Sequence, residues 1–145
     1  MNRIATSFAF LAACATPAAP PTGADMPDAS SLTPCPNRPN CVSTQATAER
    51  HRIAPIQFQG SAEEAQERLE RVLEAMPRTT IVKRAPGRLD VEFRSRLFRF
   101  VDAAEFLIDD AAHQIRFRSG ARSGYSDFGV NRARMQTIAA QFAAR

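Results

Sequence analysis

Hydrophobic residues recur at helical spacing over residues 61–76, with polar residues at the intervening positions. Ser61 and Glu64 have the spacing of a capping box, and Pro77 stops a helix because proline has no backbone N–H to continue it. We therefore predict an amphipathic helix here, with its glutamates on a solvated face. Its buried face is expected to consist of Ala62, Ala65, Leu69, Val72, Leu73 and Met76.

Downstream of this helix the hydrophobic period changes to two, which is typical of half-buried strands. The clearest run contains Leu89, Val91 and Phe93, which alternate with charged residues after a turn at Pro86–Gly87. Further strands are expected over residues 53–58 (an edge strand, because of Pro55), 79–84, 103–109 and 114–119.

The last two of these strands pair well as a hairpin. With a turn at residues 110–113, Phe106 lies opposite Phe117 on one face, and Glu105 lies opposite Arg118 on the other. Because apolar residues meet on one face and opposite charges meet on the other, a single register satisfies both.

A second helix is predicted from Asp127 to Phe142, where apolar residues again recur at helical spacing. Its apolar face extends back to Asn131, so this polar side chain points toward the core and needs hydrogen-bond partners there. The order strand, helix, four strands, helix predicts an α+β fold. We expect an antiparallel sheet of about four to five strands with two helices packed on one face.

The N-terminal residues are typical of an export signal. A basic Arg3 precedes an apolar stretch that is too short to cross a bilayer. The run Leu-Ala-Ala-Cys that ends at Cys14 looks like a lipobox, whose cysteine receives acyl chains before cleavage. An ordinary signal peptide with a chance cysteine is the alternative. Ala15 stands where a retention signal for the inner membrane often places Asp, which favours the outer membrane.

Three domain boundaries follow from this interpretation. We expect a lipoprotein signal peptide over residues 1–13 and a flexible tether over residues 14–33, because Ala, Pro, Thr and Ser dominate the tether. A single α+β domain then occupies residues 34–145. Lipid-anchored at Cys14 and palmitate-modified, the protein would face the periplasm in the cell envelope.

Cysteine parity agrees with this expectation, because the chain has three cysteines and lipidation of Cys14 leaves a pair. Cys35 and Cys41 are separated by turn-forming residues, so we predict a small disulfide-closed loop. Metal binding is the alternative, but it needs about four ligands. Neither His51 nor His113 has the spacing from the two cysteines that a shared metal site needs. We therefore expect no metal and no cofactor.

The formal net charge is +4, and arginines are concentrated in the C-terminal third. A basic chain often binds nucleic acid, but an exported protein rarely meets any, so we expect no nucleic-acid partner. The membrane, through the lipid anchor, is the first expected partner. An anionic small molecule or an envelope protein is the second.

Three stretches carry a resemblance to a known family. The first is residues 35–43, Cys-Pro-Asn-Arg-Pro-Asn-Cys-Val-Ser. The second, residues 100–109, contains Phe-Val-Asp, Glu-Phe and Ile-Asp. The third, residues 118–134, contains Arg-Ser, Arg-Ser-Gly-Tyr-Ser-Asp, Gly-Val-Asn-Arg and a final Arg. On these residues the chain resembles the domain-of-unknown-function family numbered 1499. It departs at Ala103, where the family more often has an acid, and at Gly120, where it often has Ser. The resemblance implies that the chain shares the fold of this family and belongs to it. It implies no reaction, because the family's function is unknown.

The third stretch contains the candidate site, at a Gly-rich turn between a strand and a helix start. Two interpretations stay open. The helix N-terminus with nearby arginines and serines can bind an anion. Alternatively, Asp127 caps the helix or pairs with Arg122 or Arg132, and the segment is a structural latch, with Tyr125 covering a pocket or capping the core. The candidate residues are Arg118, Ser119, Arg122, Ser123, Tyr125, Asp127, Asn131 and Arg132.

No nucleophile elbow, phosphate loop or zinc motif is found, and we predict no catalytic residue. The first hypothesis is therefore a ligand-binding or accessory module, which predicts a pocket or groove beside Arg122, Tyr125 and Arg132. The second is a structural or assembly partner of envelope proteins, which requires an exposed apolar patch. The third is a small hydrolase, which requires a cleft and a carboxylate of raised pKa.

Overall fold

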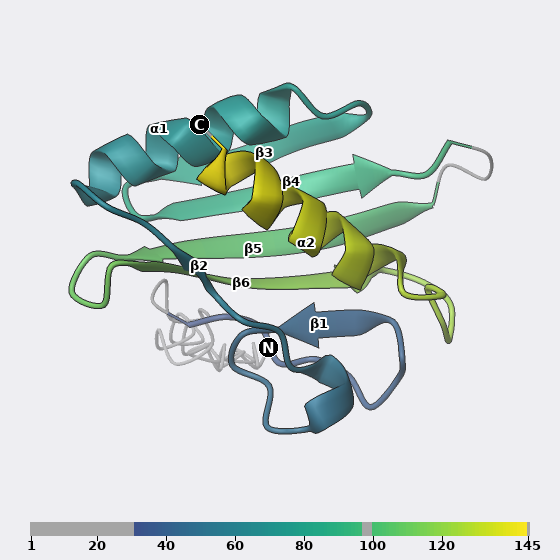
Figure 1. The fold of residues 1–145 in the computed structure, drawn as a ribbon. Coiled ribbons are helices and arrows are strands. Elements are labelled where there is room, and N and C mark those ends of the chain that lie inside the picture. The colour runs from purple at the N-terminus through teal and green to yellow at the C-terminus, as the bar shows by residue number, and fades with distance from the viewer. Residues whose placement is uncertain (1–30, 97–99, 145) are drawn as a thin grey trace, which may run out of the picture.

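A computed structural model describes residues 31–96 and 100–144. In these ranges two helices lie on one face of a six-stranded antiparallel sheet (Figure 1). The strand order is β1-β6-β5-β4-β3, and β2 pairs with the same edge of β6 as β1 does. The elements are β1 (Cys41–Ser43), the short 3-10 helix η1 (Glu49–His51), β2 (Ile56–Gln57), α1 (Ala62–Glu74), β3 (Thr79–Ala85), β4 (Arg88–Arg94), β5 (Val101–Asp109), β6 (Gln114–Ala121) and α2 (Val130–Ala143).

The predicted α+β class and the predicted placement of both helices are confirmed. The described sheet has one strand more than the upper expectation of five, because β1 was not predicted. The predicted hairpin register is also confirmed, since Phe106 pairs with Phe117 and Glu105 pairs with Arg118.

Helix α1 begins as its capping box predicts. The N–H of Glu64 donates to Ser61 Oγ at 3.2 Å, and the N–H of Ser61 donates to Glu64 Oε2 at 3.1 Å. Not all of the glutamates on this helix are simply solvated. Arg84 of β3 forms ion pairs with Glu70 at 3.1 Å and with Glu74 at 2.6 Å, which join the helix to the edge of the sheet.

The core lies between the two helices and the covered face of the sheet. Phe106 and Phe117 are almost fully buried there, and burial of such side chains typically stabilises a fold by about 1.5–3 kcal/mol each. The other fully buried large side chains include Leu69, Leu73, Leu89, Ile115, Met135, Ile138 and Phe142.

Helix α2 starts at Val130, three residues later than predicted. Phe128 and Gly129 have φ angles of 53° and 81°, in the left-handed region, and such residues cannot belong to a right-handed helix. The right-handed helix therefore begins three residues after Asp127, near which its start was predicted.

The residues that precede the disulfide loop cross the helix-free face of the sheet. Leu32 is buried, the N–H of Thr33 donates to Glu105 Oε2 at 3.0 Å, and Arg88 donates to the Ser31 carbonyl at 3.1 Å. Residues 31–33, which we assigned to the tether, thus form a strap on the sheet. The predicted signal peptide and Cys14 lie outside the described residues. None of the described helices is long and apolar enough to cross a membrane.

Candidate functional site

Residues 118–132 run from the end of β6 through a loop to the start of α2, at one end of the sheet (Figure 1). The connection from β4 to β5 lies at the same end, because Arg94 pairs with Val101 and Asp102 pairs with Ala121. The structure divides the predicted cluster into a buried polar group, a set of exposed loop residues, and Arg118 on the helix-free face.

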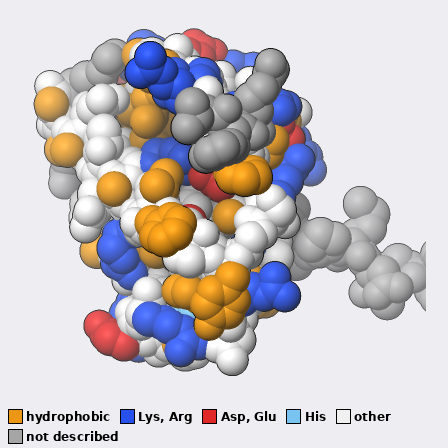
Figure 2. Space-filling model, turned by 90° about the vertical axis from the view of Figure 1, so that its right-hand side faces the viewer, with side chains coloured by type: hydrophobic (Ala, Val, Ile, Leu, Met, Phe, Trp, Pro, Cys, Tyr) orange, Lys and Arg blue, Asp and Glu red, His pale blue; other side chains and the backbone are white. Residues whose placement is uncertain are grey.

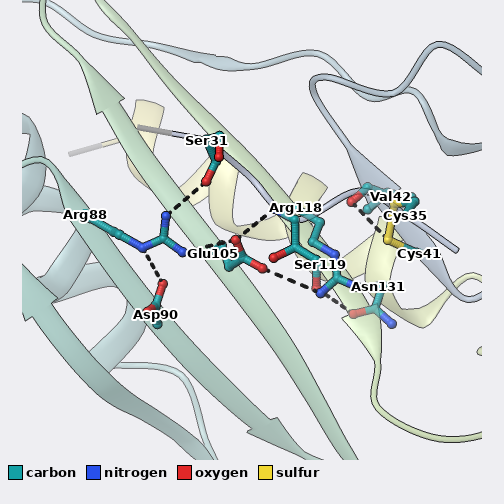
Figure 3. A network of polar contacts seen from close by, with 11 residues as sticks. Ser31, Cys35, Cys41, Val42, Arg88, Asp90, Glu105, Arg118, Ser119 and Asn131 are labelled. Carbon is teal, nitrogen blue, oxygen red and sulfur yellow. Dashed lines mark hydrogen bonds and ion pairs between the residues drawn. A yellow bond between two sulfur atoms is a disulfide. The ribbon is translucent and has the colours of Figure 1, made fainter. Parts of the chain in front are cut away.

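Ser119 and Asn131 form the centre of the buried group, and both side chains are completely buried. The Ser119 hydroxyl donates to Asn131 Oδ1 at 2.5 Å, which joins β6 to the first turn of α2 (Figure 3). Asn131 Nδ2 donates to Asp127 Oδ2 at 2.8 Å. The amide oxygen and nitrogen of Asn131 are therefore both hydrogen-bonded, as a buried amide requires.

The Asp127 carboxylate caps α2 although it stands outside the helix. It accepts hydrogen bonds from the N–H groups of Gly129 at 3.0 Å and of Asn131 at 2.9 Å. Burial raises the pKa of the Asp127 carboxyl, but the hydrogen bonds from Asn131 and Gly129 lower it by more, so this pKa lies below its ordinary value. The carboxylate occupies the donors that an anionic ligand at the helix N-terminus would need.

Two further residues belong to this polar group, and the sequence did not assign them to the site. Arg134 donates to Asn131 Oδ1 at 3.1 Å and to Asp102 Oδ2 at 2.8 Å, and its guanidinium lies 4.5 Å from the centre of the Phe93 ring. Asp102 follows the same alternation as Ala104 and Phe106, which was the available signal that it faces the core. We call Asp102, Ser119, Asp127, Asn131 and Arg134 the latch.

Arg132 ties the start of α2 to the chain that precedes β2. Its guanidinium donates to the carbonyls of Arg50 and Arg52, each at 2.9 Å. A hollow of about 260 Å³ lies beside these contacts, lined by Pro39, Cys41, Val42, Arg50, Ser126, Asp127, Gly129 and Arg132. Arg132 lines this hollow, whereas Arg122 and Tyr125 do not, so it corresponds only in part to the groove predicted beside Arg122, Tyr125 and Arg132.

Arg118 lies on the helix-free face, in an ion-pair network under the strap (Figure 3). Glu105 accepts from Arg88 at 3.1 Å and lies 3.9 Å from Arg118, and Arg88 also pairs with Asp90 at 3.0 Å. Burial lowers the pKa of the Arg118 guanidinium, and the neighbouring Glu105 carboxylate raises it by less, so the net shift is downward. Arginine nevertheless stays charged at any physiological pH.

The predicted disulfide is confirmed, with the Cα atoms of Cys35 and Cys41 5.7 Å apart. The loop that it closes is bound to the candidate segment, because Asn40 Nδ2 donates to the Gly124 carbonyl at 2.8 Å. Gly120 of β6 lies directly against the bridge. A Cβ atom at Gly120 would come 3.1 Å from Cys41 Sγ, so a side chain there would press closely on the bridge.

A second hollow, of about 320 Å³, lies between the strap, the disulfide loop and residues 43–51, and it includes His51. His51 is buried, with Nδ1 3.1 Å from the Cys41 carbonyl and Nε2 accepting from Arg50 Nε at 2.7 Å. These partners assign the proton to Nδ1 and leave neither ring nitrogen available for a ligand. We therefore interpret His51 as structural.

The exposed part of the candidate segment is apolar. Tyr125 is 71% exposed and Phe128 is 95% exposed, and Phe100 and Val130 are exposed at the same end of the sheet. We call Phe100, Tyr125, Phe128 and Val130 the loop-end surface. Figure 2 shows hydrophobic side chains gathered across this end of the molecule, with arginines around them. Tyr125 is too exposed to cap the core, and it lines neither of the two hollows described above.

Arg122 does not pair with Asp127. It pairs with Glu92 of β4 at 2.7 Å, and Arg94 binds the other oxygen of the same carboxylate at 3.1 Å. The pairing of Asp127 with Arg122 or Arg132 is thus replaced by hydrogen bonds within the latch. Ser123 lies exposed in the same loop. Within the described residues no three His, Cys, Asp or Glu side chains are grouped as metal ligands.

The fold and the site define a small α+β domain in which a buried polar latch supports an exposed apolar loop surface. The chain belongs to the family described as Protein of unknown function (DUF1499), whose profile matches residues 31–142. No curated protein and no solved structure matches the chain significantly.

Proposed function

We propose that this protein is a lipid-anchored accessory module of the cell envelope, facing the periplasm, which acts by docking through the loop-end surface. The observation that carries this proposal is Phe128. Its side chain is 95% exposed and its backbone has a φ of 53°, so it combines an unfavourable solvent contact with an unfavourable backbone conformation. A strained and exposed aromatic residue persists only where the surrounding structure holds it.

The latch supplies that support. Asp127 and Gly129, on either side of Phe128, are hydrogen-bonded to each other, and the Phe128 N–H donates to Ser126 Oγ at 3.2 Å. These hydrogen bonds restrain the backbone on both sides of Phe128, whose side chain is exposed to solvent. A surface that is already ordered loses little conformational entropy on binding, which favours docking.

Docking explains the exposed residues better than catalysis or ligand capture does. Docking onto an envelope partner requires an exposed apolar patch. The residues of the loop-end surface are apolar and exposed. In contrast, the hollow beside α2 is lined by the satisfied carboxylate of Asp127 and by Arg132, whose donors bind backbone carbonyls.

The anchor is the second part of the proposal. The run Leu-Ala-Ala-Cys at residues 11–14 supports lipidation of Cys14, and Ala15 supports delivery to the outer membrane. Metabolic labelling with a fatty-acid analogue tests it. The wild type should take up label and Cys14→Ser should not, and equal labelling of the two chains would rule out Cys14 as the anchor.

Photocrosslinking in intact cells tests docking. A photoreactive phenylalanine analogue in place of Phe128 should crosslink to envelope components. The same analogue in place of Val82, an exposed apolar residue that is 52% exposed on β3, is the matched control. Equal and weak crosslinking at both positions would sink the docking function.

A further inference from the structure

We infer that the loop-end surface docks onto an anionic phospholipid bilayer. This inference rests on the proposed function, because it names the partner of the surface for which docking is proposed. Three observations support a lipid surface: the way in which the apolar residues are presented, the sign of the exposed charges, and the length of chain ahead of the described domain.

The apolar side chains of the loop-end surface come from different segments. Phe100 ends the connection between β4 and β5, Tyr125 and Phe128 lie in the loop before α2, and Val130 is the first residue of α2. A fluid bilayer accepts protruding apolar side chains at its headgroup boundary, whereas a protein partner needs a matched, closely packed surface. Tyrosine is moreover enriched at membrane interfaces, where its ring is buried and its hydroxyl stays wet.

The charges exposed around these residues are positive. Arg94, Arg96 and Arg122 are exposed at this end of the sheet. Glu92 is shared by two arginines, and Asp102 is paired with Arg134 at 2.8 Å. The Asp127 carboxylate is hydrogen-bonded to N–H groups of Gly129 and Asn131 and keeps its negative charge. Together, Arg94, Arg96 and Arg122 outnumber Glu92 and Asp127 by one positive charge. Each arginine near an anionic bilayer strengthens binding by about fivefold.

A lipid anchor at Cys14 would keep the loop-end surface within reach of the bilayer. Cys14 lies 17 positions before Ser31 (31 minus 14), where the strap begins. A chain of that length spans at most about 60 Å. An anchored domain of this size therefore meets the bilayer as an intramolecular partner at high effective concentration, so weak contacts are sufficient.

The test uses the full lipidated chain reconstituted into vesicles. The wild type contains no tryptophan, so Phe128→Trp and Val82→Trp each introduce a single fluorescent reporter, one on the loop-end surface and one away from it. In phosphatidylglycerol-containing vesicles, emission from position 128 should shift to shorter wavelength. Brominated lipids should quench it about twofold or more relative to position 82. In pure phosphatidylcholine, or at 1 M salt, the shift should decrease.

Equal emission and equal quenching at the two positions would overturn the lipid inference. If photocrosslinks at position 128 were then found on a protein, docking would stand with a protein partner. If no crosslinks were found on either lipid or protein, the proposed function itself would fail. Tyr125 is the only tyrosine, so its emission in the unmodified chain provides a second measurement should Phe128→Trp fail to fold. Protection of Tyr125 from acrylamide only in anionic vesicles supports the inference, and unchanged access contradicts it.

Discussion

Asp127 and Asn131 are joined by two hydrogen bonds, one to the backbone N–H of Asn131 at 2.9 Å and one to its side-chain amide at 2.8 Å. One carboxylate oxygen thus fixes both the first turn of α2 and the orientation of a buried amide. The same amide accepts from Ser119, so the loop, the helix and β6 are held by one continuous polar chain.

Substitution of Asp127→Asn should lower the free energy of unfolding by about 1.5–3 kcal/mol, because it replaces charged acceptors with weaker neutral ones. Urea unfolding of the full chain measures this. Asp110→Asn is the control, since Asp110 is exposed in the hairpin turn, and it should change stability by less than about 0.5 kcal/mol. Equal stability of the two variants would contradict the latch.

The contribution of Asp127 should depend on pH. Its folded-state pKa lies below its ordinary value, so the stabilisation is present above the unfolded-state pKa of about 3.9 and is lost as pH falls through the lower folded-state value. Unfolding curves from pH 6 down to pH 2 should show the difference between wild type and Asp127→Asn shrinking below about pH 4. A difference that stays constant over this range would mean that Asp127 acts without titrating.

Asn131→Ala should cost about 3 kcal/mol or more, because it removes a buried amide and leaves Ser119, Asp127 and Arg134 short of partners. Gln136→Ala, on the exposed side of the same helix, is the control. A double-mutant cycle with Ser119→Ala should give a coupling energy of about 0.5 kcal/mol or more. Additive effects would place the two residues in separate networks.

Phe128→Asn should separate stability from docking. Asparagine adopts left-handed backbone angles more readily than phenylalanine, so unfolding should be unchanged or harder by up to about 1 kcal/mol. Protection of Tyr125 from acrylamide in anionic vesicles should nevertheless be lost, although the lipid anchor keeps the chain on the vesicle. Val82→Asn should leave docking intact, and a Phe128→Asn chain that docks as wild type does would remove Phe128 from the proposed surface.

Removal of the Cys35–Cys41 bridge by paired serine substitutions should cost about 2 kcal/mol, as the closed loop is short. Because Asn40 holds Ala121 and Gly124, amide hydrogen exchange should also accelerate at the end of β6. Exchange that rises only within residues 35–41 would show that the loop does not brace the candidate segment.

Helix α1 and the β5–β6 hairpin were predictable from the sequence. Each buries one face, so apolar side chains recur at helical spacing in the helix and at every second residue in the strands. Strand β1 was not predictable, because three residues after a turn-rich loop become a strand only through pairing with β6. The burial of Asn131 followed from its position on the helix. Its link to Arg134 and Asp102, and the pairing of Arg122 with Glu92, join residues far apart in sequence and required the tertiary structure.

The strap also determines where mechanical load enters the domain. Ser31 and Thr33 are bonded to Arg88 and Glu105, which belong to the neighbouring inner strands β4 and β5. Tension applied to the chain ahead of Ser31 is therefore transmitted to the middle of the sheet before it can reach the short edge strand β1.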